Sequence, residues 1–280
     1  MNYDFLSFYI VFIFGLIIGS FLNVVISRLP NNMNIDSNKS ESKTKGDSVF
    51  AGTIWWGRSK CPHCNAVISI KHNIPVLSYI LLKGKCSDCQ NKISIQYLIV
   101  ELLTAICFCF LFYISTNIAQ LTFIVIFSAF LISLTMIDIN KMILPDQLTL
   151  PLLWIGLLAN TDSLFIKLEH AVMGAVVGYS VLWSVFWLFK LLTGRNGMGY
   201  GDFKLLAALG AWLGWQSIPS ILLVASIMGI IFGVFMKVKT NLIKNEFAFG
   251  PFLAFAGWVS MITKINDDFS FPHLSLIFLS

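Results

Sequence analysis

Long apolar windows constrain the fold of this chain more than any other feature of its sequence. A helix needs roughly 20 apolar residues to cross a hydrocarbon core. Only 12% of the 280 residues are charged, against about 25% in soluble domains. The clearest windows are 5–29, 97–115, 118–137, 171–192 and 218–236, and shorter or more broken ones are 147–159, 203–215 and 247–265. The sequence therefore predicts an all-α polytopic membrane protein with about eight transmembrane helices.

The placement of basic residues predicts how these helices are oriented. Nine lysine or arginine residues lie between 30 and 95 against four acidic ones, and the positive-inside rule puts such a loop in the cytoplasm. Alternating eight spans from that loop leaves both termini outside and returns Lys141, Lys190 and Lys237 to the cytoplasmic side. No basic helix or RNA-binding motif accompanies the net charge of +5. We therefore expect a lipid bilayer, and no nucleic acid, as a partner.

Composition divides the chain into four parts. The first apolar window runs into "GSFLNVVISRLP" rather than into a small-residue cleavage site, so we expect a retained helix and no signal peptide. The polar stretch after it is nearly free of aromatic residues, which predicts disorder over 31–48. The parts are a first transmembrane helix (1–29), a cytoplasmic loop (30–95), a seven-span membrane block (96–266) and a C-terminal tail (267–280).

Two cysteine pairs in the loop, "CPHC" and "CSDC", predict a metal site. Their spacing is C-x2-C-x21-C-x2-C, and each pair lets two thiolates face one ion. Four protein ligands give the closed tetrahedral set typical of structural zinc. Two disulfides, an Fe–S cluster or redox pair, and a lost site are the alternatives, and a reducing cytoplasm disfavours the disulfides. The predicted zinc ligands are Cys61, Cys64, Cys86 and Cys89.

Acidic residues at the ends of the apolar windows are the candidates for chemistry, because ionisable groups at membrane depth are costly and usually functional. Asp138 ends "FIVIFSAFLISLTMID", and Asp202 follows "GMGYG". The alternating topology puts both at cytoplasmic helix ends, where they meet if the third and sixth spans pack together. Two carboxylates sharing one proton can activate water and polarise a scissile carbonyl, as in aspartic proteolysis. Gly197, Gly199 and Gly201 are expected to leave room for a substrate strand beside Asp202.

Each carboxylate also has a simpler structural interpretation. Asp202 can be the N-cap of the helix that it starts, and Asp146 in "LPDQLTLP" can cap the helix that follows it. Asp138 can be an interfacial residue paired with Lys141. Glu101, in "QYLIVELLTA", lies about a turn inside its span and can pair with a cation of the loop.

Seven motifs follow one another over nearly the whole chain. They are "GSFLNVVISRLP" (19–30), "RSKCPHC" (58–64), "PVLSYILLKGKCSDC" (75–89), "ISIQYLIVELLTA" (93–105), "IDINKMILPDQLTLPLLWIGLL" (137–158), "GMGYGDFKLLAALGAWLGW" (197–215) and "FGPFLAFAG" (249–257). Together they resemble the type IV prepilin peptidases, bacterial G-x-G-D aspartic proteases with a second, N-methyltransferase activity.

The resemblance implies a bacterial inner-membrane endopeptidase that removes a short basic leader from prepilins or pseudopilins after a glycine. It also implies methylation of the new N terminus with S-adenosyl-L-methionine as methyl donor. The family pattern carries the catalytic pair onto Asp138 and Asp202 and the zinc ligands onto the four cysteines. The supporting motif residues are Gly199, Gly201, Asp146 and Glu101. No Gly-rich nucleotide loop is visible, so the residues themselves locate no methyl-donor site.

Two other classes of protein share some of these features. A secondary transporter uses intramembrane carboxylates, but it predicts charges at the midplane and an internal repeat, which this sequence lacks. A zinc-loop scaffold for assembling a secretion machine predicts that Asp138 and Asp202 tolerate asparagine, whereas a peptidase predicts that neither does.

Overall fold

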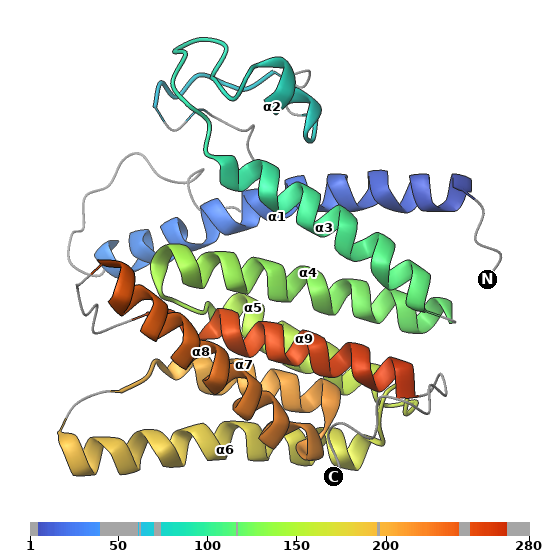
Figure 1. Cartoon of the computed structure of the whole chain (residues 1–280), viewed down its shortest axis with the longest axis vertical. Helices are drawn as coiled ribbons and strands as arrows, with labels where there is room; N and C mark the ends of the chain where they lie inside the picture. The colour runs from blue at the N-terminus through green and yellow to red at the C-terminus, as the bar shows by residue number, and fades with distance from the viewer. Residues whose placement is uncertain are drawn as a thin grey trace. The chain divides into compact units, whose positions relative to one another are not determined.

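The computed structural model shows a helical protein made of two units (Figure 1). It describes residues 5–39, 61, 63–69, 74–115, 117–194, 197–240 and 247–267. Among them no β-strand forms, and Lys85 and Lys92 make an isolated β-bridge. One unit comprises Met1–Thr116 with Ile124–Ser133, and the other comprises Asn117–Phe123 with Leu134–Ser280. The predicted all-α class is confirmed.

The first unit is built on α1 (Phe5–Lys39) and α3 (Ile95–Ile114), which pack along each other, and it also contains the short α2 (Leu77–Leu81). Two glycines of α1 set this packing. A Cβ on Gly15 would lie 2.6 Å from the Ala105 Cα, and one on Gly19 would lie 2.7 Å from the Glu101 Cα. Backbone atoms cannot move aside for a larger side chain, so both positions require glycine. The two glycines are four residues apart, which is the spacing of small residues that lets membrane helices approach closely.

Helix α1 continues past the boundary expected at residue 29. Its apolar window ends at Pro30, but the helix runs on to Lys39, so the expected disorder is wrong for residues 31–39. A helix that is already nucleated extends at little cost through residues of modest propensity. The rest of the stretch expected to be disordered, 40–48, lies outside the described residues.

The second unit is arranged around one short, buried helix, α7. Its other helices are α5 (Asp146–Ala159), α6 (Leu168–Thr193), η2 (Trp215–Ser217), α8 (Ile218–Thr240) and α9 (Gly250–Asp267), together with both ends of α4 (Ile118–Lys141). Helix α7 (Tyr200–Leu213) is buried at every residue from Leu205 onward, because α5, α6 and α9 all pack on it.

The C-terminal end of α7 is fixed to its neighbours by hydrogen bonds from three polar side chains. The Asn160 amide donates to the carbonyl of Ala211 at 3.0 Å, and Lys264 of α9 donates to the carbonyl of Leu213 at 2.8 Å. The Trp212 indole, itself on α7, donates to the carbonyl of Leu152 on α5 at 2.8 Å. The first two bonds satisfy carbonyls that the end of α7 leaves without intrahelical partners, and the third links α7 to α5, so α7 is held in one position.

The expected membrane spans all coincide with helices, but not all are long enough to cross. Within the described residues, five helical stretches are long and apolar enough: Phe5–Pro30, Ile95–Ile114, Ile118–Lys141, Leu168–Thr193 and Trp215–Lys239. Helices α5 and α7 have 14 residues each, or about 21 Å at 1.5 Å per residue, against a core of about 30 Å. The expected number of eight full crossings therefore stays a prediction.

The contact between α6 and α7 gives a stability prediction. Gly210 of α7 faces the backbone of Gly174 on α6, where a Cβ would overlap the Gly174 carbonyl. We expect Gly210→Ala to lower the free energy of unfolding by about 2–3 kcal/mol, the usual range for overpacking. The matched control is Gly233→Ala on α8, because nothing lies within 4 Å of its Cβ position and alanine is the better helix former. Thermal unfolding in detergent compares the two, and equal melting temperatures would contradict the packing.

Candidate active site and metal centre

The four predicted cysteine ligands converge in the first unit. Their Sγ atoms all lie within 4.8 Å of one another, and those of Cys61 and Cys89 are 3.8 Å apart. None of the six cysteines is in a disulfide, so the alternative of two disulfide bonds is wrong. Four sulfur ligands facing one point can hold a metal ion, and they leave no coordination position for a substrate.

Both cysteine turns have the same backbone geometry. In the first, the Cys61 amide donates to Ala66 and the Cys61 carbonyl accepts from Asn65; in the second, Cys86, Asn91 and Gln90 make the same pair of bonds. Asn65 and Gln90 adopt left-handed φ angles of 56° and 58°. Backbone N–H groups of Cys64 and His63 lower the pKa of Cys61 to about 6. Its thiolate, the form that binds metals, is therefore favoured at neutral pH.

Asp138 lies in the last turn of α4 and is only 4% exposed. Its Oδ2 accepts a hydrogen bond from the Gly250 amide at 3.0 Å. Gly250 is the first residue of α9, and the first amides of a helix have no intrahelical partners and favour negative charge. Among the described residues Asp138 makes no ion pair with Lys141, so that alternative is wrong.

Asp202 is buried on α7 and is near Asp138. It is 8% exposed, its charge interacts with that of Asp138, and it accepts a hydrogen bond from the Gly199 backbone. Gly199 is the N-cap of α7 and makes no side-chain cap. Asp202 is thus the third helical residue, and the interpretation of Asp202 as the N-cap is wrong. A third-position acid bonding back to the N-cap amide is half of a capping box, and this bond leaves the rest of the carboxylate free for chemistry.

The three glycines around Asp202 differ in how much free space lies where a side chain would be. A Cβ on Gly201 would lie 2.7 Å from the Leu144 Cβ, and one on Gly197 would lie 2.7 Å from the Phe189 ring. At Gly199 the nearest atom is the Asp202 Oδ2, at 3.8 Å. The expectation of room for a substrate strand is therefore wrong at Gly197 and Gly201, which the chain's own side chains fill, and Gly199 alone of the three keeps that room.

Leu144 lies between the starts of α7 and α9, next to the aspartate pair. It packs against Gly201 of α7, and a Cβ on Gly250 of α9 would lie 3.2 Å from its Cδ1 and 2.6 Å from the Asp138 Oδ2. Leucine at this point of the turn between α4 and α5 thus requires glycine at both positions. Leu144 did not emerge from the sequence as a site residue, and only the quoted motifs around it pointed to this place.

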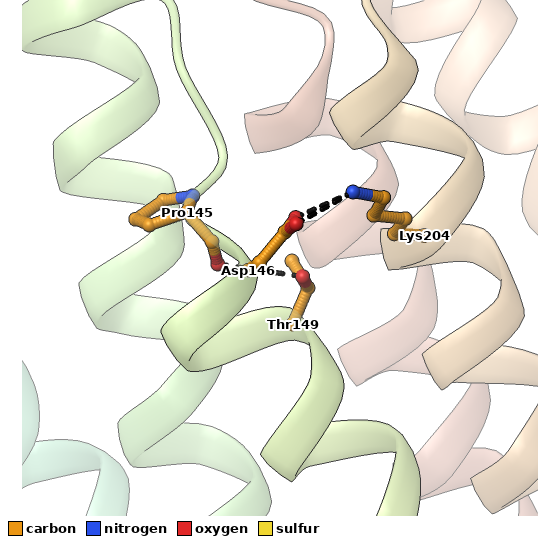
Figure 2. A network of polar contacts seen from close by, with 4 residues as sticks. All are labelled: Pro145, Asp146, Thr149 and Lys204. Carbon is orange, nitrogen blue, oxygen red and sulfur yellow. Dashed lines mark hydrogen bonds and ion pairs between the residues drawn. The ribbon is translucent and has the colours of Figure 1, made fainter. Parts of the chain in front are cut away.

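Asp146, the first residue of α5, forms an ion pair with Lys204 of α7 (Figure 2). Its two oxygens accept from the Lys204 Nζ at 2.6 and 2.8 Å, so the turn before α5 is tied to α7 two residues beyond Asp202. The expected capping role of Asp146 is wrong, because Pro145 is the N-cap and makes no side-chain cap. Thr149 closes the turn by donating to the Pro145 carbonyl at 3.3 Å. Sequence reasoning missed Lys204, although it follows Asp202 in the same motif.

Glu101 belongs to the first unit, whereas Asp138 and Asp202 belong to the second. It is 8% exposed, and its Oε2 accepts from the Val76 amide at 2.8 Å. The Ser20 hydroxyl of α1 forms a second hydrogen bond to it. Among the described residues its partners are these two groups, and the expected pairing with a loop cation is not found.

Comparison with known proteins gives matches over both units. The family model for the bacterial peptidase A24 N-terminal domain matches residues 13–115, and the model for the type IV leader peptidase family matches residues 125–234. The second match contains Asp138, Asp146 and Asp202, and the first contains Glu101 and the four cysteines.

Curated relatives match over nearly their full length, each under the name prepilin leader peptidase/N-methyltransferase. The protein of Aeromonas salmonicida is 47% identical over 97% of this chain and 95% of its own. That of Dichelobacter nodosus is 45% identical over 92% of each chain, and that of Neisseria gonorrhoeae is 44% identical over 91% and 90%. No solved structure matches this chain. With a helical membrane fold and this level of identity, the chain belongs to the type IV leader peptidase family of prepilin leader peptidase/N-methyltransferases.

Proposed function

We propose that this protein is an aspartic endopeptidase of the bacterial inner membrane that removes the leader of type IV prepilins or pseudopilins after a glycine. The observation that carries the proposal is the aspartate pair. Asp138 and Asp202 are buried, come from helices far apart in sequence and interact electrostatically. Both lie within the match to the leader peptidase family.

The environment of the two carboxylates supports a division of labour between them. Two buried carboxylates that interact cannot both hold a full charge easily, so one proton is shared. Each carboxylate accepts one backbone N–H at a helix start, Asp138 from Gly250 and Asp202 from Gly199, and we assign the ionised form to Asp138. Asp138 then takes a proton from the attacking water, and protonated Asp202 polarises the scissile carbonyl. This assignment also uses the open side of Gly199, where the substrate backbone can approach Asp202.

Zinc is the metal that we propose for the cysteine site. Tetrahedral zinc with Zn–S bonds of about 2.3 Å separates its sulfur ligands by about 3.8 Å, which is the Cys61–Cys89 distance. Cys61, Cys64, Cys86 and Cys89 would hold the ion, and its chemistry there is structural, since it ties the two turns of the loop together. The loop and the aspartate pair face the cytoplasm in this proposal, with both termini outside.

The second half of the proposed function is methylation of the new N terminus with S-adenosyl-L-methionine. The names of the curated relatives support it. A prepilin carries its leader before an apolar helix, so the helix can lie in the bilayer while the leader stays in water. Cleavage at a helix end then leaves a free amine near the membrane surface, where methylation would follow.

A reconstituted assay tests both activities. We expect proteoliposomes of this protein to cleave a prepilin after its leader glycine and to add the mass of one methyl group to the product when the methyl donor is present. A prepilin with valine in place of that glycine is the control and should be cleaved at least about 100-fold more slowly, because its larger side chain blocks close approach of the backbone. Equal cleavage of the two substrates would contradict the proposed specificity.

A further inference from the structure

The first unit holds a buried carboxylate for which the proposed peptidase chemistry has no use. Glu101 is 8% exposed and lies nearly two turns into α3, where Gly19 of α1 packs closely on its backbone. Asp88, another described acid of this unit, is exposed on the second cysteine turn. Buried ionisable groups at membrane depth are costly and usually serve a function.

The hydrogen bond that Glu101 accepts comes from a strained turn. Val76 has φ 61° and ψ −51°, and the amide of Leu77 bonds to the carbonyl of Pro75 at 2.6 Å, which makes a γ-turn. A β-branched residue with positive φ is a true outlier. Strain of this kind collects at functional sites, where the surrounding structure holds it in place. Here the group that holds it is the Glu101 carboxylate, at 2.8 Å from the Val76 amide.

The contacts of Glu101 do not by themselves require a charge. Both of its partners, the Val76 amide and the Ser20 hydroxyl, can donate to the neutral side chain of glutamine as well as to a carboxylate. Glutamine would satisfy them without the cost of burying an ionised group. Compared with glutamine, glutamate supplies at this position a negative charge, a second acceptor oxygen and the ability to take up a proton.

We propose that Glu101 is the base of the methyl-transfer reaction and receives the new N-terminal amine of the cleaved substrate. The inference rests on the methyltransferase half of the proposed function. The aspartate pair lies in the segment matched by the leader peptidase family, whereas Glu101 lies in the separately matched N-terminal segment. The Val76 N–H occupies Oε2, so the substrate ammonium would donate to the same carboxylate beside it.

The proposed step balances with a sulfonium methyl donor as co-reactant. The ammonium passes one proton to the Glu101 carboxylate and becomes a free amine. Its lone pair attacks the methyl carbon, and the carbon–sulfur bond breaks with its electron pair remaining on sulfur, which leaves a neutral thioether. The product is a secondary ammonium, and Glu101 returns its proton to water.

Three variants test this role with a mature, already cleaved pilin as substrate, so that methylation does not depend on cleavage. Glu101→Gln keeps the hydrogen-bond acceptor and removes the base, and we expect at least about a 100-fold loss of methyl transfer, as for other general bases. Glu101→Asp should restore part of the rate. Thr104→Val is the packing control, because Thr104 is fully buried about one turn later on α3 and, among the described residues, its hydroxyl donates to the Val100 carbonyl.

Two further measurements separate catalysis from folding. Cleavage of a full prepilin by Glu101→Gln should stay within about twofold of wild type. Methyl transfer by this variant should recover as the pH rises past about 8, where an α-amino group loses its proton unaided. Among the described residues, the groups that face Glu101 are the Ser20 hydroxyl of α1 and the Val76 amide, and Tyr97 is the titratable side chain one turn earlier on α3.

Three outcomes would contradict the proposed role of Glu101. Wild-type methylation by Glu101→Gln at neutral pH would overturn the inference. Joint loss of methylation and cleavage with a lower melting temperature would also overturn it, because Glu101 would then be structural. If the wild-type protein cleaves but never methylates, the methyltransferase half of the proposed function fails and this inference falls with it.

Discussion

Asp202→Asn is expected to lower the rate of prepilin cleavage by about 10⁴-fold or more, and Asp138→Asn is expected to do the same. Asparagine has the shape of aspartate and can still accept from the Gly199 or Gly250 amide, so the fold is kept. It cannot take or give the shared proton, and removal of one member of a catalytic unit commonly costs this much. Cleavage in proteoliposomes, at matched protein level and melting temperature, measures the loss.

Asp146→Asn is the matched control for this prediction. Its ion pair with Lys204 has side chains that are 53% and 31% exposed, and such pairs contribute about 0.2–1 kcal/mol. We therefore expect cleavage within about fivefold of wild type. Wild-type activity in Asp202→Asn would mean that the Asp202 side chain only stabilises the start of α7. The protein would then be better explained as a zinc-bearing membrane scaffold than as an aspartic protease.

Removal of one cysteine ligand should empty the metal site. The purified protein is expected to contain about one zinc per chain, and Cys86→Ser should lose most of it, because hydroxyl is a poor zinc ligand and structural zinc sites depend on all four donors. The binding free energy of such sites is largely folding free energy, about 10–16 kcal/mol in small zinc modules. The cysteine turns should accordingly become open to proteolysis.

Cys107→Ser is the control for the metal prediction, since Cys107 lies on α3 outside the cluster. Metal analysis and limited proteolysis of both variants decide the outcome. Full zinc content in Cys86→Ser would contradict a four-cysteine site. Iron with an absorbance typical of sulfide clusters would favour the Fe–S alternative instead.

Local patterns were enough to predict the helices and the cysteine cluster. Apolar windows predict the membrane helices because a segment in the bilayer must form all its backbone hydrogen bonds internally, and a helix does this. The cysteine spacing gives the cluster because two short turns suffice to aim four thiols at one point. The pairing of Asp138 with Asp202 needed one further assumption, that their helices pack together. The two carboxylates lie close enough for their charges to interact, but α4 and α7 are not among the extensively packed helix pairs of the described residues.

Contacts between distant parts of the sequence could not be predicted in this way. The Gly250 amide meets Asp138 across 112 positions, and Lys204 meets Asp146 across 58. Glycine at 201 gave no sign that Leu144 fills its space. The capping predictions for Asp146 and Asp202 failed by one and three residues, because helix starts depend on the turn before them, here set by Pro145 and Gly199.

The central claim is that Asp138 and Asp202 work as one catalytic unit, and a double-mutant cycle on prepilin cleavage tests it most directly. Residues that act together lose nearly everything when either is removed, so their effects are far from additive. We predict that Asp138→Asn, Asp202→Asn and the double variant all show the same residual rate. A double variant whose loss equals the product of two smaller, independent losses would contradict a shared-proton pair.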